Sequence, residues 1–467
     1  MAARAEAWVA AALALVLALH VALMLPRAEL WQYDEYYTAE RTLGIVTSGD
    51  WGTIRSNGAP SFRKPPLQYW TGAGLIHAGL PEGLALRALP FLSALGVIAL
   101  TGWLARRLSG GRPGAVLAAL LMMTGSTLFW VSASSAMLDM PAALSVLAAL
   151  CLALVARQRP RLWWAVVLAV GAGALQKAPV AALAVLPVLA LPGVPAGRHG
   201  RGALVLALTL IALWPMAQWL LHGAEALRIG VLQEGARRFL PGLQDDLSRQ
   251  LRWPGWMAAD GAVLWAGLLG LTALLPRLRR NRLTALPVGL AGGFILILTL
   301  AGGETFDRYL LLILPILAAA AGAALAHLPR GALLAPAFAL GLSLTAGGPW
   351  KDAAALGLDR PGMAPFRPLL AGFRAALAPG EAAIVCGWGK SDLIIFPGAL
   401  SLLASDGRPF RRIWTPEDIA SALAARAPLR GLCLEGEFAV LSARFPALRV
   451  VDRQAGWVHW ATPAAAP

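Results

Sequence analysis

Long apolar runs separated by short polar connectors fill roughly the first three quarters of the chain. A run of about 18 or more mostly apolar residues is long enough for a helix to cross a bilayer, where a helix satisfies its own backbone hydrogen bonds. The pattern predicts an all-α polytopic membrane domain with about eleven transmembrane helices. We expect these spans near residues 7–26, 83–105, 114–132, 138–156, 162–176, 179–195, 203–221, 258–276, 284–302, 308–327 and 331–347.

After about Pro349 the pattern changes, because charged and polar residues become more frequent and the apolar runs shorten. The stretches EAAIVCGWG and LRGLCLEG are typical of strands, TPEDIASALAARA of a capped amphipathic helix, and LRVVDRQAGWVHWA of a hairpin. The sequence therefore predicts two domains: residues 1–348 in the membrane, and a small soluble α/β domain of residues 349–467 outside it.

Composition supports a membrane protein, since 58% of the 467 residues are hydrophobic and only 14% are charged. Soluble domains carry about 25% charged residues. The net charge is +15, and nearly all basic residues are arginine. In a soluble protein this would suggest nucleic acid; here arginines are expected mainly in cytoplasmic loops, with some available for lipid phosphate.

The connectors between the apolar runs alternate in charge. One set reads ARRLSGGRPG, ARQRPR, GRHGR, RLRRNR and HLPRG, and contains no Asp or Glu. Short Arg-rich loops stay in the cytoplasm, so the N-terminus is predicted to be cytoplasmic and the C-terminal domain to lie on the outer side. The other set, which carries the acidic residues, is then external; it holds Asp34, Glu35, Asp50, Asp139, Asp245, Asp246, Glu304 and Asp307.

The three cysteines do not have the spacing of a zinc site, and none is predicted. Cys151 falls inside an apolar run and is expected to be inert. Cys386 and Cys433 both lie in the C-terminal segment, where an oxidising compartment would allow a disulfide. Two unpaired buried thiols are the alternative.

The first external loop, residues 26–80, contains the carboxylate pair Asp34 and Glu35 in the stretch WQYDEYYTAE. The loop is rich in Trp and Tyr, which favours amphipathic segments lying on the membrane surface. Asp50-Trp51 and Pro65-Pro66 are expected to break helix. Taken alone, the carboxylate pair is more often a helix cap or an interfacial charge than a functional site.

Asp139 makes a functional site more plausible. It lies in LDMP, where the third span is expected to turn into the fourth, and its neighbours are apolar. A carboxylate is costly at membrane depth, and such residues usually mark function. The alternative is that Asp139 caps the fourth span, and both roles are compatible.

Cations accompany these carboxylates on the outer side. Arg63 and Lys64 stand in FRKPP, Arg308 and Tyr309 open a span in RYLLLILP, and Lys177 stands between the fifth and sixth spans. Arg and Lys bind phosphate through charge-assisted hydrogen bonds, although snorkelling toward headgroups is a common alternative. Carboxylates beside such cations suit group transfer from a lipid-linked phosphate, with a carboxylate as general base and cations stabilising the leaving phosphate.

The order DE–SGDW–KPPLQYW–ARRL–LDMP–RYLLLILP resembles the C-type glycosyltransferases that use polyprenyl-phosphate sugars, most of all the group of protein O-mannosyltransferases and lipid A aminoarabinose transferases. The resemblance covers about the first 200 residues and returns near Arg308. It implies a GT-C-like fold and an inverting transfer at C1 of the sugar. It makes Asp34 the essential catalytic carboxylate and Asp139 the second catalytic acidic residue. Lys64 and the pair Arg308–Tyr309 would then meet the donor phosphate.

Two departures from the family pattern bear on this reading. Many relatives have Arg where Tyr37 stands, and many have Glu where Arg63 stands. Loss of that Glu removes a carboxylate that would help to hold a divalent cation, so we expect no required cofactor and do not favour a metal. The more positive site favours an anionic donor or acceptor. An acceptor phosphate needs no general base, and Asp34 would then orient the donor sugar.

The sequence therefore predicts a multi-pass glycosyltransferase of a bacterial inner membrane with a periplasmic active site. Its partners are expected to be membrane lipid, a polyprenyl-phosphate sugar and an acceptor that is lipid A, another glycolipid, a polysaccharide or a protein hydroxyl, and not nucleic acid. The rival hypotheses are a transporter of a lipid-linked sugar and a non-catalytic scaffold. Candidate substrate-lining residues are Glu35, Tyr37, Lys177, Arg237 and Arg238, the last two with a plain surface helix as the alternative.

Overall fold

The computed structural model describes most of the helical region and much of the C-terminal sheet. The described ranges are 33–56, 59–177, 198–236, 252–259, 263–278, 285–300, 307–345, 367–377, 383–386, 410–413, 429–454 and 456–462, with a few further helical residues before and between them.

The chain forms two compact units. The first comprises Met1–Pro26, Phe62–Gln68 and Arg87–Leu358, and the second comprises Arg27–Ser61, Tyr69–Leu86 and Asp359–Pro467. Helices α3 (Leu67–His77) and α4 (Glu82–Ser109) each contribute residues to both units. The predicted domain boundary at residues 348 and 349 falls outside the described residues and stays a prediction.

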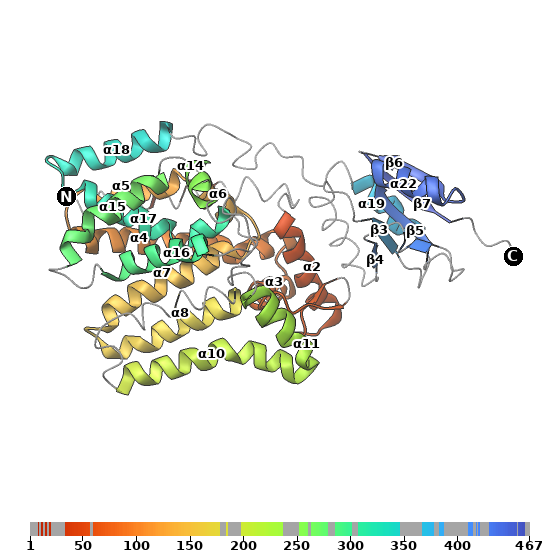
Figure 1. The fold of residues 1–467 in the computed structure, drawn as a ribbon, viewed down its shortest axis with the longest axis horizontal. Coiled ribbons are helices and arrows are strands. Elements are labelled where there is room, and N and C mark those ends of the chain that lie inside the picture. Colours follow the sequence, from red (N-terminus) through yellow and green to blue (C-terminus); the bar gives the residue numbers. More distant parts are fainter. Residues whose placement is uncertain are drawn as a thin grey trace. The chain divides into compact units, whose positions relative to one another are not determined.

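In the first unit, three long helices lie side by side. Helix α8 (Trp163–Gln176) packs between α7 (Asp139–Ala156) and α10 (Arg198–His222), as Figure 1 shows. The Ser145 hydroxyl of α7 donates a hydrogen bond of 2.7 Å to the carbonyl of Ala169 in α8. Such bonds between helices help to hold helical membrane proteins together, where lipid is as apolar as the side chains.

A second group of helices packs around α17 (Leu314–Leu325), whose sequence LPILAAAAGAAL places small residues along most of its length. It contacts α5 (Ala115–Thr124) and α15 (Val263–Leu278), and α18 (Gly331–Thr345) packs against α5. Small residues let helix backbones approach closely. The remaining helices of this unit are α6 (Thr127–Ser134), η1 (Pro160–Leu162), α11 (Ala224–Leu227), η2 (Arg228–Ala236), α14 (Arg252–Ala259), α16 (Ala285–Leu300) and η4 (Asp307–Leu312).

Large apolar side chains are exposed on the outer helices, as expected for surfaces that face lipid. Leu168 on α8 is 71% exposed, Leu220 on α10 is 75% exposed and Leu333 on α18 is 76% exposed. Within the described residues, three helices are long and apolar enough to cross a membrane, namely Glu82–Ser109, Asp139–Ala156 and Arg201–His222. The total of about eleven spans stays a prediction, because most of the expected spans 7–26 and 179–195 lies outside the described residues.

The third expected span, residues 114–132, is not one continuous helix, and this corrects the sequence prediction. Helices α5 and α6 are bent by 71° where the chain passes through Gly125 and the extended residue Ser126. The Trp130 indole donates a hydrogen bond of 2.7 Å to the carbonyl of Thr124 at the break. A side chain thus satisfies a backbone group there, which makes a broken helix tolerable at membrane depth.

The first-loop part of the second unit contains α2 (Tyr33–Ser48) and a short antiparallel pair of β1 (Arg55–Ser56) and β2 (Ala59–Pro60). It also contains Tyr69–Leu86, which includes most of α3 and the first residues of α4. The predicted turn at Asp50 is present, since its carboxylate accepts hydrogen bonds from the backbone of Gly52 and Thr53 and pairs with Arg55. Desolvation raises the pKa of Asp50, but these donors outweigh it and hold the pKa below its usual value.

The C-terminal residues form a five-stranded sheet in the order β4-β3-β5-β7-β6 (Figure 1). The pairs β3–β4 and β3–β5 are parallel, whereas β5–β7 and β6–β7 are antiparallel. The predicted strands and hairpin are confirmed; the predicted helix TPEDIASALAARA lies mostly outside the described residues. The elements are α19 (Arg367–Ala376), β3 (Ala383–Cys386), β4 (Phe410–Ile413), β5 (Arg430–Leu434), α22 (Glu435–Arg444), β6 (Arg449–Gln454) and β7 (Trp457–Ala461).

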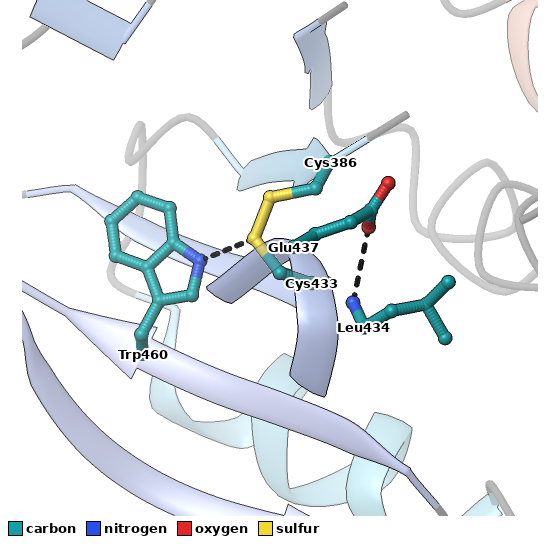
Figure 2. The surroundings of a disulfide bond; sticks show 5 residues. All are labelled: Cys386, Cys433, Leu434, Glu437 and Trp460. Carbon is teal, nitrogen blue, oxygen red and sulfur yellow. Dashed lines mark hydrogen bonds between the residues drawn. A yellow bond between two sulfur atoms is a disulfide. The ribbon is translucent and has the colours of Figure 1, made fainter. Parts of the chain in front are cut away.

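Cys386 and Cys433 form a disulfide between the neighbouring strands β3 and β5, with their Cα atoms 4.8 Å apart (Figure 2). Of the two alternatives left open by the sequence, the structure therefore has the disulfide. The Trp460 indole donates a hydrogen bond of 3.0 Å to Cys433 Sγ. Gly431 lies opposite Trp460 in the sheet, and a Cβ at Gly431 would approach the indole ring to 2.2 Å, so the ring needs glycine there.

Candidate functional site

Asp139 is the first residue of α7, and its side chain is 5% exposed. Its carboxylate faces cations through both oxygens. Oδ1 lies 2.6 Å from the Lys177 ammonium, and Oδ2 lies 3.8 Å from Arg308 Nε. The N-cap position of α7 is Leu138, so the alternative role of Asp139 as the helix cap is wrong. The carboxylate instead joins the ends of three separate elements.

Lys177 ends α8, and its backbone N–H donates a hydrogen bond to the Gly173 carbonyl. Its ammonium lies 4.5 Å from the centre of the Tyr309 ring in addition to its contact with Asp139. A cation over an aromatic face is attracted to the ring, and the attraction grows where water is excluded. Lys177 is therefore fixed between a carboxylate and an aromatic ring.

Arg308 and Tyr309 lie in the 3₁₀-helix η4, which packs against α7. The Arg308 side chain is 26% exposed, whereas Tyr309 is buried. The Asp139 carboxylate thus contacts two cations. A partly exposed guanidinium beside an ammonium suits an anionic group such as phosphate.

Gln176 was not predicted from the sequence, although it fixes the turn that carries Asp139. Its amide donates hydrogen bonds of 3.3 Å to the carbonyl of Leu138 and 3.2 Å to the side chain of Gln68. Gln176 is buried. It therefore ties the end of α8 to the residue that precedes Asp139.

Lys64 forms an ion pair with a residue far from it in the sequence. Its ammonium lies 2.8 Å from the carboxylate of Glu234 in η2, and Arg63 beside it is exposed. Arg237 and Arg238, the other predicted lining residues, lie outside the described residues. The structure thus brings together Asp139, Lys177, Arg308 and Tyr309, and gives Lys64 a partner that the sequence analysis did not foresee.

In the second unit, Asp34 and Glu35 lie in the first turn of α2. Acidic residues at this end of a helix are favoured by the helix dipole. Glu35 is buried and Asp34 is half-buried. The Asp34 carbonyl accepts a hydrogen bond of 3.0 Å from the Thr38 hydroxyl. The first turn is therefore well anchored, with the Asp34 side chain partly accessible.

Arg41 lies about two helical turns after Asp34 and was also missed by the sequence analysis. Its guanidinium is buried at 5.1 Å from the Tyr37 ring and 5.7 Å from the Tyr69 ring, and Nη1 donates a hydrogen bond of 3.0 Å to the Tyr69 hydroxyl. The family's Arg is absent where Tyr37 stands, but α2 presents another on the same face. The spacing from Tyr37 to Arg41 was the available signal.

The electrostatics of this cluster keep Tyr69 neutral. Burial raises the pKa of the Tyr69 phenol, and the carboxylates of Asp34 and Glu40 raise it further, while Arg41 opposes them. Glu40 in turn accepts a hydrogen bond of 3.0 Å from the Ser56 hydroxyl. Asp34 thus lies in a region of α2 that contains a buried cation and several aromatic rings.

The amino-acid sequence is similar to that of known enzymes over part of its length. Residues 9–192 match the family model described as dolichyl-phosphate-mannose-protein mannosyltransferase. Over 142 residues the chain is 35% identical to the undecaprenyl phosphate-alpha-4-amino-4-deoxy-L-arabinose arabinosyl transferase of Edwardsiella ictaluri (strain 93-146). That match covers 30% of this chain and 25% of the relative.

The fold is similar to solved structures over the whole chain. The crystal structure of ArnT from Cupriavidus metallidurans bound to undecaprenyl phosphate gives a TM-score of 0.75 at 19% identity, covering 99% of this chain and 100% of that chain. The apo state of the same protein gives 0.74 at 19% identity, covering both chains completely. The resemblance predicted from the sequence is thus matched by the family model over residues 9–192, and over the whole chain the fold is like that of ArnT.

Proposed function

We propose that the protein is a membrane glycosyltransferase that moves a sugar from undecaprenyl phosphate to an extracytoplasmic acceptor. The observation that carries the proposal is the cluster in which Asp139 holds Lys177 and Arg308 beside Tyr309. The family model over residues 9–192 and the ArnT fold support it, since the ArnT crystal structure contains undecaprenyl phosphate.

The cations take the phosphate in this proposal. Arg308 is partly exposed and presents a planar guanidinium, which suits two phosphate oxygens, and Lys64 provides a second positive charge. Lys177 and Tyr309 are buried and hold the cluster together. Both oxygens of Asp139 face cations, so this carboxylate positions the cations and does not take a proton from the acceptor.

Asp34 is the proposed catalytic carboxylate, on the strength of the DE motif at the start of α2. The acceptor oxygen attacks C1 of the sugar, the bond from C1 to the phosphate oxygen breaks, and undecaprenyl phosphate leaves with the electron pair. If the acceptor is a hydroxyl, Asp34 takes its proton. If the acceptor is already an anionic phosphate, Asp34 orients the sugar instead, and Glu35 and Tyr37 line the substrate.

We place the reaction on the periplasmic face of a bacterial inner membrane, with the C-terminal sheet on the same side. The Cys386–Cys433 disulfide supports this side, because disulfides persist in oxidising compartments and are rare in the cytosol. The acceptor is lipid A or another glycolipid, a polysaccharide, or a protein hydroxyl. In this proposal the reaction requires no metal ion.

The test uses purified protein in lipid nanodiscs, a panel of undecaprenyl-phosphate sugars, and membrane extract as acceptor. Release of free undecaprenyl phosphate is followed for the wild type, for Asp34→Asn, and for Glu82→Gln, an exposed carboxylate at the start of α4 that serves as control. We expect release by the wild type and the control and its loss in Asp34→Asn. Equal release by all three would assign the chemistry to another residue, and no release from any donor by folded wild type would contradict the function.

A further inference from the structure

The ion pair between Lys64 and Glu234 joins residues 170 positions apart in the chain. The Lys64 side chain is 25% exposed and the Glu234 side chain 11% exposed. The neighbouring pair Glu225–Arg228 is much more exposed, with side chains at 53% and 55%. Lys64 and Glu234 are thus partly sheltered from water, which strengthens their interaction relative to an ordinary surface pair.

The segment that carries Glu234 is fixed onto the stretch that carries Lys64. Glu234 lies in η2, a π-helical segment, and π-helical turns are rare and often occur at functional sites. A Cβ at Gly230 of η2 would lie 2.8 Å from the Phe62 carbonyl oxygen, so only glycine allows this approach. The Phe62 ring also lies 5.2 Å from the His222 ring at the end of α10. These contacts direct Glu234 at Lys64.

We propose that Glu234 is an internal competitor for the phosphate-binding Lys64, so that donor phosphate must displace the carboxylate and Glu234 returns when the product leaves. This inference rests on the proposed function, in which Lys64 binds the phosphate of the lipid carrier. A carboxylate and a phosphate on the same ammonium would repel each other at short range, so they exchange and do not bind together.

The charges of donor and product make such a competitor useful. The donor is a phosphodiester with one negative charge, whereas the product is a phosphate monoester with about −1.5 to −2 charge near pH 7. Cations that bind the donor therefore bind the product more strongly. A carboxylate that returns to Lys64 weakens the hold on the product and promotes its release.

Glu234 differs in this respect from Asp139. Asp139 is more deeply buried, and it is the first residue of the long helix α7. Because it lies between two cations, it stays in place and orients them. Glu234 lies on the short segment η2 and pairs with the partly exposed Lys64. The structure therefore separates a permanent counter-charge from an exchangeable one.

The experiment measures binding of undecaprenyl phosphate to the protein in nanodiscs. Glu234→Gln keeps the size of the side chain and removes its charge, and we expect the Kd to fall about fivefold. Glu225→Gln removes the charge of the neighbouring exposed pair and should leave the Kd unchanged. Adding Glu234→Gln to a Lys64→Gln variant should give no gain, because the gain requires the Lys64 ammonium.

Turnover gives a second readout that a merely structural role would not produce. Glu234→Gln should lower both KM and kcat, since product leaves more slowly, and inhibition by added undecaprenyl phosphate should become stronger. Unchanged or weaker binding in Glu234→Gln overturns the competitor role. Wild type that binds no undecaprenyl phosphate overturns the proposed function itself, which is a distinguishable result.

Discussion

The two compact units each contain a carboxylate that the sequence analysis singled out, but the surroundings of the two differ. Asp139 in the first unit is buried against Lys177 and Arg308. Asp34 in the second unit is half-buried in the first turn of α2. A carboxylate with cations on both oxygens organises positive charge, whereas a partly accessible one can act on a substrate. The family resemblance seen in the sequence had implied a catalytic role for both.

The largest expected effect separates these two roles. Asp34→Asn should lower kcat about 1,000-fold while the Kd for undecaprenyl phosphate stays within about twofold, since general-base catalysis contributes about 10²–10⁴ in rate. Asp139→Asn should mainly raise the KM for the donor, by about tenfold, because the cations lose their fixed orientation. Steady-state kinetics on both variants, with binding measured separately, checks the contrast. A reversed pattern would exchange the roles of the two residues.

Removing the cation beside Asp139 should destabilise the first unit. Lys177→Gln leaves the buried Asp139 carboxylate with Arg308, whose Nε lies 3.8 Å away, and we expect the free energy of unfolding to fall by about 3 kcal/mol. The double variant Lys177→Gln with Asp139→Asn should regain most of this stability without regaining activity, since it removes the uncompensated charge. Thermal unfolding in detergent measures both. Equal loss in the single and the double variant would show that the pair is not coupled.

The C-terminal sheet of the second unit also contains a buried ionisable group, His459 in β7. Burial, helped by the positive charge of Arg430 and opposed by Asp452, lowers the pKa of His459 to about 4. The unfolded chain takes up this proton near pH 6.5 but the native sheet only near pH 4. The contribution of neutral His459 to the free energy of unfolding is therefore complete above about pH 7. It is lost as the pH falls from about 6.5 to about 4, which lowers the free energy of unfolding by about 2–3 kcal/mol.

Hydrogen exchange of the peptide that covers β7 in the full-length protein, corrected for intrinsic rates, measures this loss. His459→Phe should remove it, because the side chain no longer titrates; the ring contact with Phe373, whose centroid lies 5.0 Å away, can be kept. Protection that is independent of pH in the wild type would contradict the prediction.

The smallest expected effect concerns Arg41. Arg41→Lys keeps the charge but loses the planar contacts with Tyr37 and Tyr69, and should cost about 1 kcal/mol. Arg55→Lys is the matched control, since Arg55 pairs with Asp50 at the surface of the same unit and should change stability by less than about 0.5 kcal/mol. Chemical denaturation compares the two. Similar effects for both would mean that the aromatic contacts of Arg41 contribute nothing particular.

Much of the fold was predictable, because apolar runs encode helices locally. The helices near residues 83–105, 138–156 and 203–221 match α4, α7 and α10. The break between α5 and α6 was not predicted, since both halves are apolar and only the backbone at Gly125–Ser126 changes direction. Hydropathy reports how apolar a run is, not where it bends.

Single sequence motifs predicted part of the candidate site. LDMP and RYLLLILP identified Asp139 and Arg308, which the structure brings together. The partner of Lys64 was not identifiable, because Glu234 lies 170 residues away and no local pattern relates the two. Arg41 could have been predicted from the sequence, because its spacing from Tyr37 places both residues on one face of α2.

The cluster around Asp139 also has a consequence for how the protein is made. The chain is synthesised from its N-terminus, so Asp139 enters the membrane before either of its cationic partners, Lys177 and Arg308, exists. Until α8 is complete, Asp139 at the start of α7 lacks both of these partners, and the cluster closes only after η4 has emerged. Assembly of the site is therefore a late event in biogenesis, and a chain that stops before Arg308 cannot contain it.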